Sequence, residues 1–163
     1  MKKRVVITGM GVVAPNGYGL EAYGSALRAG RSGIRFVPRM EELKFGCQVG
    51  GTAPDGFDLV KEKYFDNEEI QSVNDNISFA SVAAVDAWRD AGFTVPEADD
   101  DRVDWDAGVI AGSGIGGMDT IAETLVPLVN DGKCRRMGSR VVEQAVSYTH
   151  LRAHETVLDL VCR

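Results

Sequence analysis

The chain has 163 residues, and its hydrophobic content of 44% is enough for a globular core. Its 24 acidic side chains outnumber 18 basic ones, giving a formal net charge of -6. A broad attraction to nucleic acid or to an anionic membrane surface is therefore not expected. The three cysteines lack paired spacings and no segment is long enough to span a membrane, so we expect free thiols and a cytoplasmic protein.

The first third of the chain predicts a strand, a helix and an irregular stretch, in that order. Residues 4–9 (RVVITG) are typical of a strand buried on both faces of a parallel sheet. After a loop, the spacing of apolar residues predicts a helix over 20–29, ended by Gly30. Residues 31–58 show no sustained period, which predicts an irregular surface excursion with a weak strand near 47–49.

The rest of the chain predicts more helix and a second strand. Residues 61–74 are consistent with short amphipathic helical turns. Residues 76–92 predict a helix that is buried nearly all round, which implies layers on more than one side. A buried strand is predicted at about 107–111, followed by a glycine-rich turn and a helix over 118–130. Together these elements predict an α/β layered architecture with a parallel sheet.

The first loop offers one functional alternative. Gly9 to Ala14 match the literal G-x-G-x-x-A form of a dinucleotide fingerprint after a strand. That chemistry requires a helix to begin in the turn, so that its first N–H groups meet a pyrophosphate. Pro15 to Gly17 delay the helix here. A dinucleotide-binding domain is kept as an alternative to an ordinary tight turn.

The two histidines offer a second alternative. His150 and His154 are four residues apart and would share one helix face. A metal site would need Glu155 or Cys162 as a further ligand, but the order H-x-x-x-H-E differs from the zinc-protease motif and no third ligand is evident. We expect an ordinary amphipathic helix and no metal.

Five motifs in one order carry a family resemblance. They are RVVITGMGVVAPNG, RAGRSGI, ISFASVAAVDAWRDAG, GVIAGSGIGG and RRMGSRVVEQA. From about Lys3 to Ala145 the chain resembles the N-terminal part of a β-ketoacyl-[acyl-carrier-protein] synthase of the thiolase fold. The resemblance implies part of the first half of an α/β/α/β/α layered fold, incomplete in this chain, and a homodimer for the intact enzyme.

The resemblance implies an acyltransferase of fatty acid biosynthesis. An acyl group passes from a carrier-protein thioester to a cysteine, and decarboxylative Claisen condensation with malonyl-carrier protein follows, without a metal or redox cofactor. The family's cysteine lies in a T-A-C-A or S-A-C-A turn downstream of the position of Ala145, and its two catalytic histidines lie in the second half. Neither occurs in this sequence, and Cys47 and Cys134 lie outside the matching place. We therefore expect no catalytic residue here and an inactive chain.

Supporting residues can still be carried over from the resemblance. Ile115, with Gly114 and Gly116, matches the loop that lies at the acyl-chain pocket. Where relatives carry cations for docking the acyl carrier protein, this chain has Glu68 and Glu69. An alternative docking cluster consists of Lys133, Arg135 and Arg136.

The end of the chain does not continue the family pattern. We expect a partial synthase domain over 1–145 and a non-native tail over 146–163, which is excluded from functional reasoning. Three functions stay open: a truncated condensing enzyme, a non-catalytic synthase-like partner of the chain-length-factor type, and the dinucleotide-binding domain.

Overall fold

The computed structural model describes residues 4–96, 104–113, 116–138, 141 and 144. The chain divides into two compact units, one within residues 1–67 and 79–95 and the other within 68–78 and 96–163. Each unit is described by itself. Among the described residues, no helix has the length and apolar character needed to cross a membrane.

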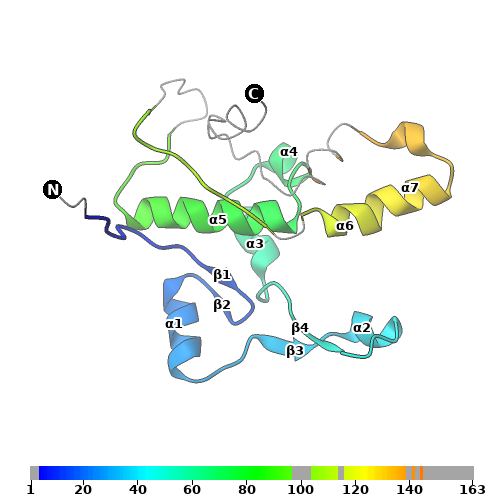
Figure 1. The fold of residues 1–163 in the computed structure, drawn as a ribbon, viewed down its shortest axis with the longest axis horizontal. Helices are drawn as coiled ribbons and strands as arrows, with labels where there is room; N and C mark the ends of the chain where they lie inside the picture. Colours follow the sequence, from blue (N-terminus) through cyan, green and yellow to red (C-terminus); the bar gives the residue numbers. More distant parts are fainter. Residues whose placement is uncertain (1–3, 97–103, 114–115, 139–140, 142–143, 145–163) are drawn as a thin grey trace. The chain divides into compact units, whose positions relative to one another are not determined.

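The first unit opens with a small hairpin and a helix. β1 (Val13–Ala14) pairs antiparallel with β2 (Gly17–Tyr18), and α1 (Leu20–Arg28) follows directly (Figure 1). Gly30 adopts a φ of 64° and donates its N–H to the carbonyl of Leu27, which ends the helix. The predicted helix over 20–29 is thus confirmed. Its residue Ala26 is buried, with 1% of its surface exposed.

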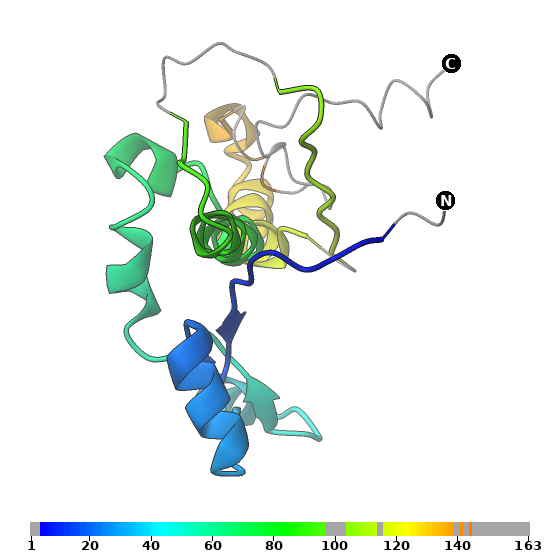
Figure 2. The same cartoon turned by 90° about the vertical axis from the view of Figure 1, so that its left-hand side faces the viewer.

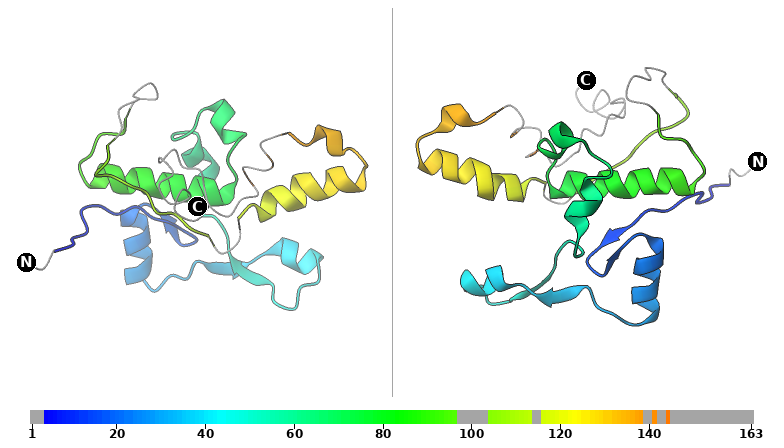
Figure 3. Two further views of the ribbon diagram at one scale, coloured as in Figure 1. Left: turned by 45° about the horizontal axis from the view of Figure 1, so that its top comes forward. Right: turned by 180° about the vertical axis from the view of Figure 1, so that it is seen from behind.

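A second hairpin lies in the stretch predicted to be an irregular excursion, and its second strand lies close to the weak strand predicted near 47–49. β3 (Ile34–Phe36) pairs antiparallel with β4 (Val49–Gly51), and α2 (Pro38–Glu42) lies between them in the chain (Figure 3). The side chains of Ile34, Phe36 and Val49 are exposed while Arg35 is half-buried. The strand at 34–36 was missed because three residues are too few to establish an alternation of apolar and polar side chains.

An aromatic cluster forms part of the core of the first unit. Phe57 begins the short helix α3 (Phe57–Lys61) and is only 3% exposed. Its ring centroid lies 5.0 Å from that of Phe79 and 6.4 Å from that of Tyr18. The short helix α4 (Asn67–Ile70) confirms the prediction of short helical turns over 61–74, whereas α3 begins in the stretch predicted to be irregular.

The longest helix is α5 (Asp75–Asp90), which Figure 2 shows nearly end-on. It confirms the predicted helix, and Gly92 ends it with a φ of 82° and an N–H bond to the carbonyl of Arg89. The prediction of burial all round is wrong, because Ala84 is exposed. Ser78 and Val82 are the side chains with 0% exposure. Small residues on α5 let the backbone of neighbouring segments approach the helix closely. The number of apolar residues in the sequence did not predict this close approach.

The two predicted buried strands are also wrong as hydrogen-bonded elements. Neither 4–9 nor 107–111 pairs with a strand among the described residues. Val5, Ile7 and Ile110 are 95%, 83% and 98% exposed. A strand of a parallel sheet takes its hydrogen bonds from distant segments. The local sequence shows the apolar run but cannot show whether such neighbours are present.

The second unit contains a nearly continuous helical rod (Figure 3). It consists of α6 (Met118–Thr120), the π-helical turn η1 (Ile121–Leu125) and α7 (Val126–Asn130), which confirms the predicted helix over 118–130. Pro127 lacks the N–H that an α-helix would need at its position, and the preceding π turn accommodates this loss. A short 3₁₀ turn, η2 (Cys134–Arg136), follows.

Candidate functional site

The glycine-rich segment 112–117 lies immediately before α6 in the second unit. Gly116 and Gly117 are buried, and Gly117 has a φ of 66° at the position before the helix begins. This left-handed conformation favours glycine. Two of the predicted pocket residues, Gly114 and Ile115, lie outside the described residues, whereas Gly116 is placed at the start of the helical rod.

The first turn of α5 contacts one residue of the segment and one residue of α6 directly after it. The side-chain amide of Asn76 donates to the hydroxyl of Ser113 at 3.3 Å. The backbone N–H of Asp75 donates to the carboxylate of Asp119 at 3.0 Å. A carboxylate at the beginning of a helix is also favoured by the helix dipole. Residues on both sides of the buried glycines are therefore attached to the same turn.

A second polar network lies beside these contacts. Asn74 caps α5 by accepting the N–H of Ile77 at 2.9 Å, and its amide donates to the carbonyl of Gln144 at 2.5 Å. The side chain of Gln144 accepts from Thr120 at 3.3 Å and donates to the carbonyl of Gln71 at 3.1 Å. Asn74 and Thr120 are each 7% exposed. Buried polar groups with satisfied partners hold one arrangement of the chain.

The predicted docking residues lie in and beside η2. The ammonium of Lys133 forms an ion pair with Asp131 at 2.7 Å. Arg135 and Arg136 belong to the 3₁₀ turn and are exposed, as is Cys134 between the cations. The structure thus brings the three basic residues together within one short turn.

The first glycine pair has a packing role. A Cβ atom on Gly9 would overlap the carbonyl oxygen of Ala87, and one on Gly11 would overlap that of Ala83. Both glycines therefore let the extended chain before β1 lie directly against α5 (Figure 2). The residues that follow form the β1–β2 hairpin, and α1 begins only at Leu20. In the described part of the chain no helix begins within this loop, which is the arrangement that pyrophosphate binding requires.

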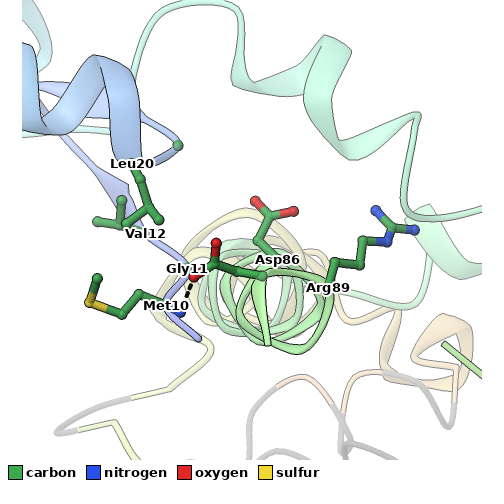
Figure 4. A pocket seen from close by; sticks show the side chains of 8 residues that line it. Met10, Gly11, Val12, Leu20, Asp86 and Arg89 are labelled. Atoms are coloured by element: carbon green, nitrogen blue, oxygen red, sulfur yellow. Dashed lines mark hydrogen bonds between the residues drawn. The ribbon is translucent and has the colours of Figure 1, made fainter. Parts of the chain in front are cut away.

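A shallow depression of about 350 Å³ lies beside this contact. Figure 4 shows Met10, Leu20, Asp86 and Arg89 around it, with the N–H of Met10 donating to the carboxylate of Asp90 at 2.9 Å. Asp86 accepts a hydrogen bond from Tyr64 at 2.5 Å. The carboxylates at this depression are therefore engaged in holding α5 to its neighbours.

The cysteines and histidines are the remaining side chains that could react or bind a metal. Cys47 and Cys134 are free and exposed. His150, His154 and Cys162 lie outside the described residues. Within the described ranges, no three His, Cys, Asp or Glu side chains are grouped as metal ligands would be.

Comparison with known proteins decides the family. Residues 2–150 match the family of the β-ketoacyl synthase N-terminal domain. The chain belongs to the β-ketoacyl synthase family. It is 37% identical over 131 residues to 3-oxoacyl-[acyl-carrier-protein] synthase 2 of Coxiella burnetii, covering 80% of this chain and 30% of that protein. It is also 33% identical over 148 residues to the chloroplastic 3-oxoacyl-[acyl-carrier-protein] synthase I of Arabidopsis thaliana, covering 90% of this chain and 30% of that protein.

Solved ketosynthases support the fold. A β-ketoacyl synthase from Burkholderia phymatum superimposes with a TM-score of 0.65 at 26% identity, covering 91% of this chain and 35% of that one. The ishigamide ketosynthase/chain length factor gives 0.63 at 25% identity, covering 90% and 34%. The chain therefore has part of the thiolase-like fold of ketosynthases, and it spans about a third of the length of these structures.

Sequence reasoning missed most of the polar residues that support the glycine-rich segment. Asn74, Asp75 and Asn76 directly precede an apolar helical run, which is a helix-start signal that points to Asn74 as the cap. Nothing in the local sequence relates this turn to Asp119 or Gln144. These contacts join residues 44 and 70 positions apart.

Proposed function

We propose that this chain is the N-terminal part of a 3-oxoacyl-[acyl-carrier-protein] synthase that condenses an acyl thioester with malonyl-carrier protein by decarboxylative Claisen chemistry. The observation that carries the proposal is the family match over residues 2–150, together with relatives of that name at 33% to 37% identity. Residues 1–145 form the functional part, and 146–163 contribute nothing to it. Removal of 146–163 should leave carrier-protein binding unchanged, whereas a loss of binding would contradict the assignment.

The chain by itself is proposed to be inactive. Cys47 lies before β4 and Cys134 begins a 3₁₀ turn, and neither precedes a long helix that would stabilise a thiolate nucleophile. Incubation with an acyl thioester, followed by mass spectrometry of tryptic peptides, should show no stoichiometric acylation of one cysteine. Specific acylation that a Cys47→Ser or Cys134→Ser variant removes would overturn this proposal.

The glycine-rich segment is proposed to contact the acyl chain through Ile115, with Gly114 and Gly116 shaping the backbone. Support comes from Gly116, which is buried beside the rod that begins at Met118. An Ile115→Phe variant should weaken binding of palmitoyl pantetheine more than binding of hexanoyl pantetheine in calorimetric titrations. Ile34→Phe, at a side chain that is 58% exposed in the first unit, is the control. Equal effects of both substitutions would argue against the assignment.

The acyl carrier protein is proposed to dock on Lys133, Arg135 and Arg136. Their common turn presents positive charge to an acidic partner, whereas Glu68 and Glu69 on α4 would repel one. Charge reversal with Arg135→Glu and Arg136→Glu should weaken binding at least about tenfold at low salt, with a smaller effect at high salt. Arg39→Glu in the exposed Arg39–Glu42 pair of α2 is the matched control. Equal affinities for both variants would exclude this surface.

A second candidate function is a synthase-like partner without catalysis. It is supported by the likeness to the ishigamide ketosynthase/chain length factor and by the acidic pair Glu68 and Glu69. Such a partner should form a stable complex with an active synthase while binding the carrier protein only weakly. Size-exclusion chromatography of the chain mixed with an active synthase, and of the chain mixed with the carrier protein, distinguishes the two candidate functions.

A further inference from the structure

The residues that follow α7 fold into one short turn, here called the basic turn (residues 131–136). Its backbone is held by the preceding helix, because the N–H groups of Asp131, Gly132 and Lys133 donate to carbonyls of α7 at 3.0, 3.1 and 2.8 Å. Gly132 has a φ of 66°, the left-handed conformation that commonly ends a helix. The carbonyl of Lys133 then accepts the N–H of Arg136 at 2.8 Å. The side chains of Asp131 and Lys133 are therefore attached to a fixed backbone.

One of the three cations of the basic turn is already paired within the chain. The ammonium of Lys133 lies 2.7 Å from the carboxylate of Asp131, and these side chains are 48% and 58% exposed. Arg135 and Arg136 are exposed, and neither forms an ion pair with another residue in the described part of the chain. The basic turn therefore presents two unpaired cations to a partner rather than three.

The pair between Asp131 and Lys133 is weak enough to be exchanged. Water screens both charges of an exposed ion pair, and two side chains must be held in one arrangement. A carboxylate of a binding partner can replace Asp131, but it gains only the difference between two similar contacts. A carboxylate that meets Arg135 or Arg136 gains a contact without breaking one. Asp131 thus reduces the contribution of Lys133 and leaves that of the arginines intact.

We propose that Asp131 is a specificity-determining residue of the basic turn, which competes with the carboxylates of an acidic partner for Lys133. The inference rests on the proposed docking of the acyl carrier protein at this turn. Binding then depends mainly on Arg135 and Arg136, whose planar guanidinium groups can each bind a carboxylate through two hydrogen bonds. A partner must place its carboxylates opposite these two residues, and a merely dense negative charge gains little from Lys133.

A double-mutant cycle separates this competition from a general effect of charge. Asp131→Asn removes the competing charge with almost no change of shape, Lys133→Met removes the ammonium, and a double variant combines the two. Asp58→Asn is the matched control. It makes the same change of net charge and breaks the ion pair of Asp58 with Lys61, which measures 3.1 Å, in the first unit.

Each full-length variant is titrated against fluorescently labelled acyl carrier protein, with anisotropy as the readout. Asp131→Asn should tighten binding at least about threefold at low salt, with a smaller gain at high salt, and Asp58→Asn should change it less than about twofold. Lys133→Met should cost less than about twofold in the wild type but at least about threefold in the Asp131→Asn background. Equal effects of the two asparagine substitutions, or equal costs of Lys133→Met in both backgrounds, overturn the competition.

Poly-L-glutamate is the second probe, because it carries carboxylates without the shape of the carrier protein. Asp131→Asn should strengthen its binding more than that of the carrier protein, since a further carboxylate is always within reach of Lys133. An equal gain for the two probes overturns the specificity role. If the carrier protein binds no variant while the cycle holds for poly-L-glutamate, the proposed carrier docking is wrong and the competition stands. If neither probe reproduces the cycle, the role of Asp131 is wrong.

Discussion

The hydroxyl of Tyr64 donates to the carboxylate of Asp86 at 2.5 Å, and so connects the segment after α3 to the middle of α5. Because its single proton is used there, the hydroxyl of Tyr18, 2.6 Å away, donates to Tyr64. The guanidinium of Arg89 lies 5.3 Å from the centroid of the Tyr64 ring. The β1–β2 hairpin, the α3 region and α5 are thus joined by one short chain of hydrogen bonds.

A Tyr64→Phe substitution should lower the free energy of unfolding by about 1–2 kcal/mol, since it removes a part-buried hydrogen bond to a carboxylate and the acceptor for Tyr18. Tyr23→Phe is the matched control, because the hydroxyl of Tyr23 takes no part in this chain of contacts. Urea denaturation followed by circular dichroism measures both. Equal stabilities of the two variants would show that the contacts contribute nothing.

The same tyrosines predict a loss of stability at high pH. Burial raises the pKa of the Tyr64 hydroxyl, with a further contribution from the hydrogen bond to Asp86, and burial likewise raises the pKa of Tyr18. The folded state therefore holds these protons more tightly than the unfolded chain. Their contribution is complete below the ordinary tyrosine pKa of about 10 and is lost as the pH rises above it.

The measurement for this prediction is the midpoint of thermal unfolding between neutral pH and strongly alkaline pH. The Tyr18→Phe, Tyr64→Phe double variant should lose less stability than the wild type over the alkaline range, because neither position can ionise. Parallel pH profiles for the two proteins would show that Tyr18 and Tyr64 do not cause the loss of stability at high pH.

The packing of Gly11 against α5 predicts a sensitive position. A Cβ atom there would overlap the backbone carbonyl of Ala83, which cannot move away without disturbing the helix. Gly11→Ala should therefore reduce the free energy of unfolding by about 1–3 kcal/mol. Gly46→Ala is the control, since nothing lies within 4 Å of its Cβ position, and it should stay within about 0.5 kcal/mol of the wild type. Comparable losses would show that packing against α5 is not the cause.

The exposed apolar runs predict poor solution behaviour. Ile7 and Ile110 are 83% and 98% exposed, and they lie in segments that have no strand partner in the described part of the chain. Such segments favour pairing with other molecules. Ile7→Lys with Ile110→Lys should raise the soluble yield and reduce light scattering. Glu41→Lys, at an exposed site of α2, changes charge without removing apolar surface. If it gives the same improvement, charge alone explains the effect.

Local patterns in the sequence predicted the helices well. The stripe over 20–29, the run over 76–92 and the segment over 118–130 each became helix, because hydrogen bonds within a helix join residues that are close in the chain. The predicted strands at 4–9 and 107–111 depended on partners far away in sequence. The strand at 34–36 was missed because it is only three residues long, which is too short for a period of two to be recognised.

The candidate site was predictable only in part. The glycine-rich segment and the cations Lys133, Arg135 and Arg136 were visible in the sequence, and their roles stay predictions. The contacts of Asn76 and Asp119 were not, because a hydrogen bond between residues that are distant in sequence leaves no periodic trace. Three-dimensional structure was needed to show which polar residues support the segment.

The sharing of α5 between the two units has a practical consequence for dissection of the protein. Asp75 to Ser78 belong to one unit and Phe79 to Asp90 to the other, although the helix is continuous. A cut at that junction would leave each product with a broken helix end and unpaired backbone groups. The two units are therefore unsuited to separate expression, because each would carry a broken end of α5.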